Sequence, residues 1–402
     1  MLHTTIKLLM KKFKQYVTHV GSGPRPKSLL MAKKEYDRGE LSKEEFEAIL
    51  NIHVRQAVRI QLETGLKQVN DFEYSRFFSY FGNITGLKGF RQNAYPMRWP
   101  SGDVVMVPIL EGKIEYDEKH PISATEVGRV KSFLEEIGSD AKIKVTVPSP
   151  GMLEGYYPSL QAIKASTPLD PETEAVIAEL EAKVKNYYPS LLDYLKEIAR
   201  IIVNEIKGAI RAGASIIQLD SPDWVHYTRP DVPGTVAKEA FERKLHTSNL
   251  VLSEIPSSVE THYHICWGNV MNALLVTTGS YRTNNMLDYL YRLKVDVLGP
   301  LMVSDNLRDD IFLKDFQENP PPEKMGLAVG ILDKSTRTLE PVEVLVRRAL
   351  PYADLVGLDR LYLAPSCGFE SGVGYSIHDP IDVSRKLTNL VKAARKLEEK
   401  YK

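Results

Sequence analysis

The stretch YPSLLDYLKEIARIIVNEIKGAIRAGASIIQLD, residues 188–220, joins a long helical pattern to a short apolar run. Apolar residues recur every three to four positions up to Gly213, a residue type that commonly ends a helix. The run SIIQLD (215–220) follows almost at once and is typical of a buried strand. The stretch therefore predicts a helix that leads directly into a buried strand, which is the repeating unit of α/β folds.

Similar apolar runs occur along the whole chain. The expected strands are 16–22, 67–72, 143–149, 215–220, 261–266, 295–300, 326–332 and 360–365. Helical patterns separate many of them, as at 41–65, 188–213, 341–353 and 384–402. Eight strands that alternate with helices predict an α/β fold of the (β/α)8 TIM barrel type, with a doubly wound sheet as the alternative.

Two segments depart from the simple alternation. Residues 83–130 contain short extended pieces and few helical signals, which predicts a β-rich insertion after the second strand. Residues 165–184 are typical of a loop that leads into an extra helix, with Pro171 near its first turn. The chain has 402 residues, 43% of them hydrophobic. We therefore expect a single barrel domain over 1–402 with an excursion at about 83–130.

Charge and cysteine content narrow the kind of function. The 52 Lys and Arg residues equal the 52 Asp and Glu residues, so no basic field predicts binding to nucleic acid. Two cysteines are too few for a disulfide scaffold and favour a reducing compartment, so we expect a cytoplasmic protein. No stretch has the roughly 20 apolar residues of a membrane span, and residues 1–16 lack the apolar centre of a signal peptide. A small molecule is the expected partner.

Polar side chains follow the expected strands at their C-terminal ends, where (β/α)8 barrels carry their active sites. They are Gly21-Ser22, Asn70-Asp71, Ser149, Asp220, His264, Cys266 and Ser366-Cys367-Gly368. His264 and Cys266 are two positions apart on one strand, so they point to the same side. Cys367 follows a strand that is not a neighbour, but a narrow barrel mouth allows its sulfur to meet them.

Two cysteine sulfurs and one imidazole form a donor set that suits zinc. Three protein ligands leave a position for water or substrate, which predicts a catalytic zinc site rather than a structural one. The alternative is that both cysteines and His264 are ordinary core residues. His262 has the same parity on its strand, and we expect it in the core or behind the ligands.

Five motifs resemble those of a known family. They are THVGSGPRP (18–26), VTVPSPGML (145–153), IIQLDSP (216–222), HICWGN (264–269) and LYLAPSCGFES (361–371). In order and across nearly the whole chain, they are similar to the catalytic barrel of cobalamin-independent methionine synthase. The last two look closest to its single-barrel branch, which includes epoxyalkane:coenzyme M transferase. The resemblance implies a barrel fold, a zinc ion and the alkylation of a thiol.

The resemblance also implies roles for individual residues. His264, Cys266 and Cys367 match the zinc ligands of the family. Ser22 and Asp220 match positions that hold the amino-acid part of homocysteine.

Three positions match the family less well. Asp71 lies where the family usually has the glutamate of a Gly-Glu pair. A further glutamate ligand of the family has no counterpart in VDVLGPLMVSDN (295–306), where Asp305 is the carboxylate able to reach the mouth. Trp267 stands where the single-barrel branch usually has arginine.

Together these residues predict a zinc-dependent thiol alkyltransferase that methylates homocysteine to methionine. Homocysteine is favoured because Asp220 and Asp71 can pair with its ammonium group. Coenzyme M is the alternative acceptor, and its sulfonate would need a cation such as Arg25 or Arg76. The methyl donor is a folate or a methyl-corrinoid, the latter free or carried by a partner protein.

Three other functions stay open at this point. One is a lyase or ring-opening transferase that uses zinc as a Lewis acid. Another is a barrel of the porphyrinogen decarboxylase type without catalytic zinc. The third is a binding protein whose structural zinc is enclosed by Asp305 or His262.

Overall fold

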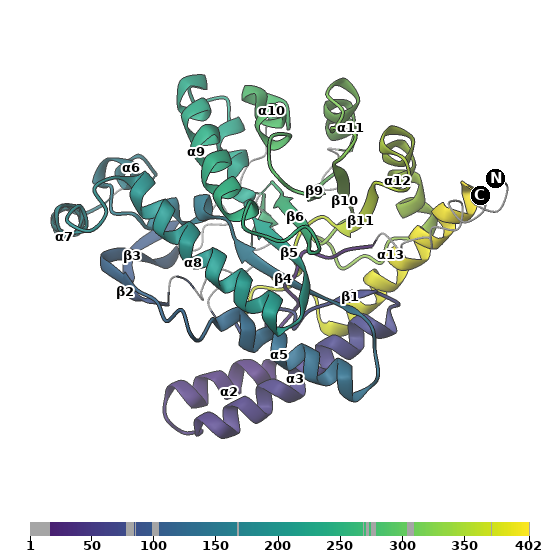
Figure 1. Cartoon of the computed structure of the whole chain (residues 1–402), viewed down its shortest axis with the longest axis horizontal. Coiled ribbons are helices and arrows are strands. Elements are labelled where there is room, and N and C mark those ends of the chain that lie inside the picture. Colours follow the sequence, from purple (N-terminus) through teal and green to yellow (C-terminus); the bar gives the residue numbers. More distant parts are fainter. Residues whose placement is uncertain are drawn as a thin grey trace.

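The computed structural model describes residues 17–77, 84, 86–98, 104–166, 169–267, 269–270, 273–274, 279–303, 309–370 and 372–401. Its centre is a sheet of seven parallel strands in the order β1-β4-β5-β6-β9-β10-β11. They are β1 (Gln68–Val69), β4 (Lys142–Pro148), β5 (Ala214–Asp220), β6 (Glu260–Ile265), β9 (Val297–Met302), β10 (Gly326–Leu332) and β11 (Leu361–Pro365). The sheet curls and helices surround it (Figure 1).

An extended segment takes the place of the eighth strand. Val17 forms a parallel bridge with Leu363 of β11, and the side chain of Gln68 on β1 donates a hydrogen bond to the Val17 carbonyl. The segment therefore lies between the two edges of the curled sheet. The predicted (β/α)8 fold is confirmed, but the first expected strand, 16–22, is not a regular strand. Residues 21–26 include two glycines and two prolines, and proline has no N–H with which to extend a ladder.

The helices form the outer layer of the fold (Figure 1). They are α2 (Lys27–Asp37), α3 (Lys43–Glu63), α5 (Ile122–Glu136), α6 (Leu160–Ser166), α7 (Pro171–Val184), α8 (Leu191–Ala212), α9 (Gly234–Leu252), α10 (Met286–Leu290), α11 (Asp309–Glu318), α12 (Val342–Val356) and α13 (Pro380–Lys400). Short 3-10 turns lie at Pro150–Tyr156, Pro222–Thr228 and Thr283–Asn285. Among the described residues, no helix has the length and the apolar character needed to span a membrane.

The helix and strand of the stretch 188–220 form as predicted. The Ser190 side chain accepts a hydrogen bond from Asp193 N at the start of α8, which is a standard helix N-cap. Gly213 ends the helix with a φ of 123°, a conformation that disfavours residues with a β-carbon. The chain then enters β5 at Ala214, so the cap directs it into the sheet.

The β-rich insertion is a hairpin of β2 (Lys88–Arg98) and β3 (Val104–Glu115), which lies beside α7 (Figure 1). The insertion was expected to extend to about residue 130, but its strands end before that point. Helix α5 begins at Ile122, because its apolar residues recur with helical spacing and bury Val127, Val130 and Phe133. Another two-stranded pair, β7 (Asn269–Val270) with β8 (Ala273–Leu274), follows β6.

The interior of the barrel is polar. Lys144 of β4 donates hydrogen bonds to Thr18 Oγ1 at 2.8 Å and to the His19 carbonyl at 2.6 Å. The ring of His19 is buried, and neither of its nitrogens makes a hydrogen bond within the described part of the chain. Burial, reinforced by the charge of Lys144, lowers the pKa of His19 to about 3, so this histidine is neutral in the folded protein.

Candidate functional site

Three residues with metal-binding side chains meet at the C-terminal rim of the barrel. The ligand atoms of His264, Cys266 and Cys367 lie within 4.8 Å of one another, and all three residues are buried. The two sulfurs are 3.7 Å apart. Because β6 and β11 are separated by β9 and β10 in the sheet, the contact crosses the barrel mouth. The structure thus brings together the three residues that the sequence singled out.

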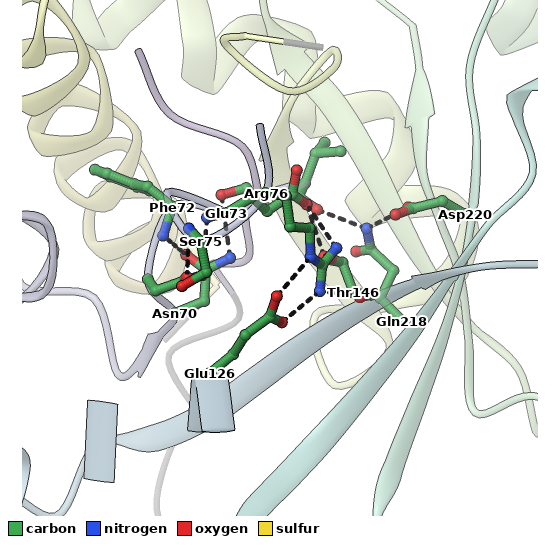
Figure 2. Close-up of polar contacts among 12 residues, drawn as sticks. Asn70, Phe72, Glu73, Ser75, Arg76, Glu126, Thr146, Gln218 and Asp220 are labelled. Carbon is green, nitrogen blue, oxygen red and sulfur yellow. Dashed lines mark hydrogen bonds and ion pairs between the residues drawn. The ribbon is translucent and has the colours of Figure 1, made fainter. Parts of the chain in front are cut away.

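Asp220 orients the imidazole of this cluster. Its Oδ1 lies 3.0 Å from His264 Nδ1. The same oxygen accepts a hydrogen bond of 2.7 Å from Gln218 Nε2 (Figure 2). The second ring nitrogen, His264 Nε2, is buried without a hydrogen-bond partner in the described part of the chain. A buried nitrogen of this kind calls for a partner, and a metal ion is one that fits.

Without a metal, the charges in the cluster favour a proton on His264 and a thiolate at Cys367. A bound metal would displace the proton of His264, because only the neutral imidazole is a ligand. Burial alone would lower the pKa of His264, but the carboxylate of Asp220 and the nearby sulfur of Cys367 outweigh burial and raise it to about 9. The hydrogen bond from Cys266 holds the pKa of Cys367 well below its usual range, against the effect of burial, and His264 acts in the same direction. The thiolate is the form of cysteine that binds metals, so the site supplies it without needing alkaline pH.

The donor set fits zinc, which takes sulfur and nitrogen ligands readily. Within the residues that the structure describes, no fourth His, Cys, Asp or Glu joins the cluster. His262 lies apart from it, because its Nε2 is 2.8 Å from Glu260 Oε1 and its ring packs against Tyr362. Asp305, the other residue considered for the fourth position, lies outside the described residues.

Ser22 lies directly beside the chain that follows Cys367. The hydrogen bond from Phe369 N to the Ser22 carbonyl, of 3.0 Å, joins the two segments. A β-carbon added at Gly368 would lie only 2.2 Å from Ser22 Oγ. Gly368 therefore leaves room for the Ser22 hydroxyl next to the cluster.

Asp71 uses its carboxylate within its own turn. Its Oδ1 accepts a hydrogen bond of 2.8 Å from Glu73 N, and its Oδ2 accepts one of 3.3 Å from Ser75 N. Such contacts are typical of an aspartate that stabilises a turn.

Glu73 is the carboxylate that extends from this turn toward β4 and Gly21. Its Oε1 accepts a hydrogen bond of 2.6 Å from Thr146 Oγ1 and lies 3.8 Å from Arg76 Nη1 (Figure 2). A β-carbon at Gly21, which has a φ of 140°, would be 2.6 Å from the same oxygen. Burial raises the pKa of Glu73 to about 7 although Arg76 opposes this, and the nearby charge of Asp220 raises it further.

The sequence analysis did not select Glu73, because the direction of its side chain depends on the backbone conformation of its turn. Phe72 and Glu73 have φ values of 55° and 59°, in the left-handed region that favours glycine. The glycine of a Gly-Glu pair would therefore fit the conformation of Phe72, and the glutamate would then correspond to Glu73 rather than to Asp71.

The two arginines considered for a sulfonate are both engaged with carboxylates. Arg76 donates to both oxygens of Glu126, at 3.1 and 2.8 Å, and also contacts Thr146 (Figure 2). Arg25 lies 3.6 Å from Glu370 and donates to the Arg76 carbonyl at 2.6 Å. Both guanidinium groups are buried and their charges are compensated within the protein.

Trp267 points away from the metal-binding side chains, as expected for the residue next to Cys266 on an extended chain. Its ring stacks on Phe312 of α11 with centroids 5.2 Å apart, and it also packs against Tyr281. At this position the chain therefore has an aromatic side chain that packs between the barrel and α11.

Comparisons with known proteins agree with this architecture. The family model described as "Cobalamin-independent synthase, Catalytic domain" matches residues 187–396. The uncharacterized protein YxjH of Bacillus subtilis is 24% identical over 379 residues, which are 88% of this chain and 86% of YxjH. The 5-methyltetrahydropteroyltriglutamate-homocysteine methyltransferase of Thermotoga maritima is 23% identical over 96% of this chain. This chain, however, spans only 44% of the length of that relative.

A solved structure extends the comparison to the fold. The B12-independent methionine synthase from Shewanella sp. W3-18-1, solved in complex with selenomethionine, matches with a TM-score of 0.68 and 17% identity. The match covers 96% of this chain and 98% of that one. Since the family model matches just over half of the 402 residues, this chain belongs to the family of cobalamin-independent synthase catalytic domains.

Proposed function

We propose that this protein is a zinc-dependent methyltransferase that methylates the thiol of homocysteine and so forms methionine. The observation that carries the proposal is the buried meeting of His264, Cys266 and Cys367 across the barrel mouth. Membership of the synthase family supports methyl transfer as the reaction class. The Thermotoga relative is named as a homocysteine methyltransferase, which supports homocysteine as the acceptor.

The chain would hold the metal through His264 Nε2 and the sulfurs of Cys266 and Cys367. Bound zinc would lower the pKa of a thiol that joins it and keep the sulfur nucleophilic at neutral pH. Asp220 would fix the ring of His264 through Nδ1, so that Nε2 stays available. Three protein ligands leave a position for the substrate, as in catalytic zinc sites.

The acceptor's ammonium group would be bound by carboxylates at the rim. We assign this role to Asp220 and to Glu73, because Asp71 is used by the backbone of its own turn. Glu73, whose pKa is about 7, would become fully ionised beside a bound ammonium group. Ser22 would offer its hydroxyl to the same part of the substrate.

The charge distribution argues against two alternatives. Coenzyme M needs a cation for its sulfonate, and a porphyrinogen decarboxylase needs several for its substrate's carboxylates. Arg25 and Arg76 are each paired with a buried glutamate, which disfavours both as partners for these anionic groups.

The rim would contribute to methyl transfer mainly by positioning. A thiol held between the cluster and the carboxylates has its sulfur fixed relative to an incoming methyl donor, which lowers the entropic part of the barrier. The carbon–sulfur bond forms as the bond between methyl and donor breaks, and the donor keeps that electron pair. A folate or a methyl-corrinoid, free or carried by a protein, is the proposed donor.

The test is methionine formation from L-homocysteine by zinc-loaded protein, with methyltetrahydrofolate and methylcobalamin supplied separately. We expect methionine from one of these donors, and loss of at least 99% of the rate in Cys266→Ser. The matched control is His262→Gln, on the same strand but outside the cluster, which should keep most of the rate. Absence of methionine with both donors would exclude the free folate and the free corrinoid as methyl sources, and an unchanged rate in Cys266→Ser would contradict the proposal.

A further inference from the structure

Cys367 is the member of the metal-binding cluster that lies furthest from its strand along the chain. His264 is part of β6, a central strand of the sheet, and Cys266 follows that strand directly. Cys367 follows the end of β11 by two residues, after Ser366, whose N–H still bonds to the Leu332 carbonyl at 2.8 Å. The position of its sulfur therefore depends on contacts made by the loop that follows.

Glu370 anchors that loop. The residue is only 3% exposed, and one carboxylate oxygen accepts a hydrogen bond from Arg25 N. The other oxygen accepts a hydrogen bond of 2.6 Å from Gly374 N and lies 3.6 Å from Arg25 Nη1. One buried side chain thus joins the loop after Cys367 to the segment that contains Ser22.

Arg25 extends this link to another loop of the rim. Its guanidinium group donates to the Arg76 carbonyl at 2.6 Å and also to the Glu73 carbonyl, both in the turn that follows β1. Hydrogen bonds to charged groups are stronger than neutral ones, and burial keeps water from competing for them. The loops that meet where the two edges of the curled sheet come together are therefore held as one unit.

We propose that Glu370 is a positioning residue of the metal site, which fixes the loop after β11 so that the Cys367 sulfur can share a metal ion with His264 and Cys266. Both of its oxygens already accept hydrogen bonds from backbone N–H groups, so its effect reaches the cluster through the chain and not through contact with the metal. This inference rests on the proposed function, because it concerns the metal site on which that function depends.

Glu370→Gln tests the inference with little change in shape. Glutamine has one carbonyl oxygen, so its NH2 group would face one of the two N–H donors, and Arg25 would lose its counter-charge. Competition with a chelator should show zinc binding weakened about 10-fold, the lower end of the range for residues that support metal ligands. In the cobalt(II)-substituted protein, the sulfur-to-cobalt charge-transfer absorption should weaken as well, because the Cys367 sulfur is no longer held at the metal.

Glu205→Gln is the matched control. Glu205 of α8 is 2% exposed, and its oxygens accept hydrogen bonds from Ile122 N at 3.0 Å and Ser123 N at 2.7 Å, so it makes the same kind of link in the outer helical layer. Both substitutions should lower the free energy of unfolding measured with urea. Only Glu370→Gln should change the zinc affinity and the cobalt spectrum, because a purely structural role would leave both unchanged.

Glu370→Asp replaces Glu370→Gln if that variant loses its circular dichroism spectrum. Aspartate keeps the charge opposite Arg25 but is one methylene shorter, so it cannot reach both N–H groups. Because half of the link is preserved, zinc binding should weaken by roughly threefold, about half of the expected effect on a logarithmic scale.

The possible failures can be told apart. If the folded Glu370 variant has the zinc affinity and cobalt spectrum of the wild type, or if Glu205→Gln changes them equally, the inference is wrong while the proposed function stands. If the wild-type protein binds neither zinc nor cobalt, the proposed function fails and the inference fails with it.

Discussion

Asp220 and His264 are direct partners in the parallel pairing of β5 with β6, and Asp220 Oδ1 lies 3.0 Å from His264 Nδ1. The carboxylate is itself held by Gln218 Nε2 at 2.7 Å. This arrangement fixes the ring and leaves Nε2 as the nitrogen next to the two cysteines. It is the kind of support that metal-binding histidines usually have.

Asp220→Asn should weaken zinc binding about 10- to 100-fold, because losing the partner of a metal-binding histidine has an effect of this size. Competition with a chelator measures the affinity. The matched control is Glu260→Gln, which alters another carboxylate–histidine pair, 2.8 Å from His262 Nε2, away from the cluster. Equal zinc affinity in Asp220→Asn and wild type would show that the contact does not support a metal site.

Gly368→Ala should disturb the rim, because the new β-carbon would lie 2.2 Å from Ser22 Oγ. We expect a loss of about 1–3 kcal/mol in the free energy of unfolding, as for other overpacked sites. Urea unfolding measures it, and calorimetry should show weaker binding of homocysteine.

Gly128→Ala provides the control for this substitution. Gly128 is exposed in α5, and an added β-carbon there would have no neighbour within 4 Å. Stability should stay the same or rise by up to about 1 kcal/mol, because alanine favours helices. Similar effects at both glycines would remove the argument for a close contact with Ser22.

The pH dependence of stability should include a contribution from His19. In the unfolded chain its pKa is near 6.5, whereas in the folded protein it is about 3. Below pH 6.5 the unfolded chain therefore takes up a proton that the folded protein does not, and stability falls as the pH decreases toward 3. Between pH 7 and 4.5 this amounts to about 2–3 kcal/mol.

His19→Gln removes this titration and should flatten the corresponding part of the profile. Urea unfolding of both proteins at pH 7 and 4.5 gives the comparison. Other groups, including His262 with its pKa lowered to about 4, titrate in both proteins and cancel in the difference. An identical loss of stability in the two proteins would mean that His19 is protonated when folded.

The buried strands were the part of the fold most accessible from the sequence. The run 326–332 coincides with β10, and the run 215–220 differs from β5 by one residue, because strands buried on both faces are continuous apolar segments. The expected strand 67–72 is shorter in the structure, since β1 ends at Val69. The left-handed backbone of Phe72 and Glu73 turns the chain there, and apolar pattern alone does not encode that turn.

The candidate site, like the fold, has residues that the sequence predicted and residues that only the structure revealed. The grouping of His264, Cys266 and Cys367 could be predicted because strand parity and a narrow barrel mouth leave few other arrangements. Glu73 could be identified only from the structure, because the backbone conformation of its turn decides where the carboxylates of Asp71 and Glu73 point.

Zinc-edge X-ray absorption of the purified protein, with and without L-homocysteine, tests the central claim most directly. It counts the sulfur ligands of the metal that His264, Cys266 and Cys367 are proposed to bind. We predict two sulfurs in the free protein and three after homocysteine is added. A count that remains at two, or a protein that binds no zinc, would contradict the account.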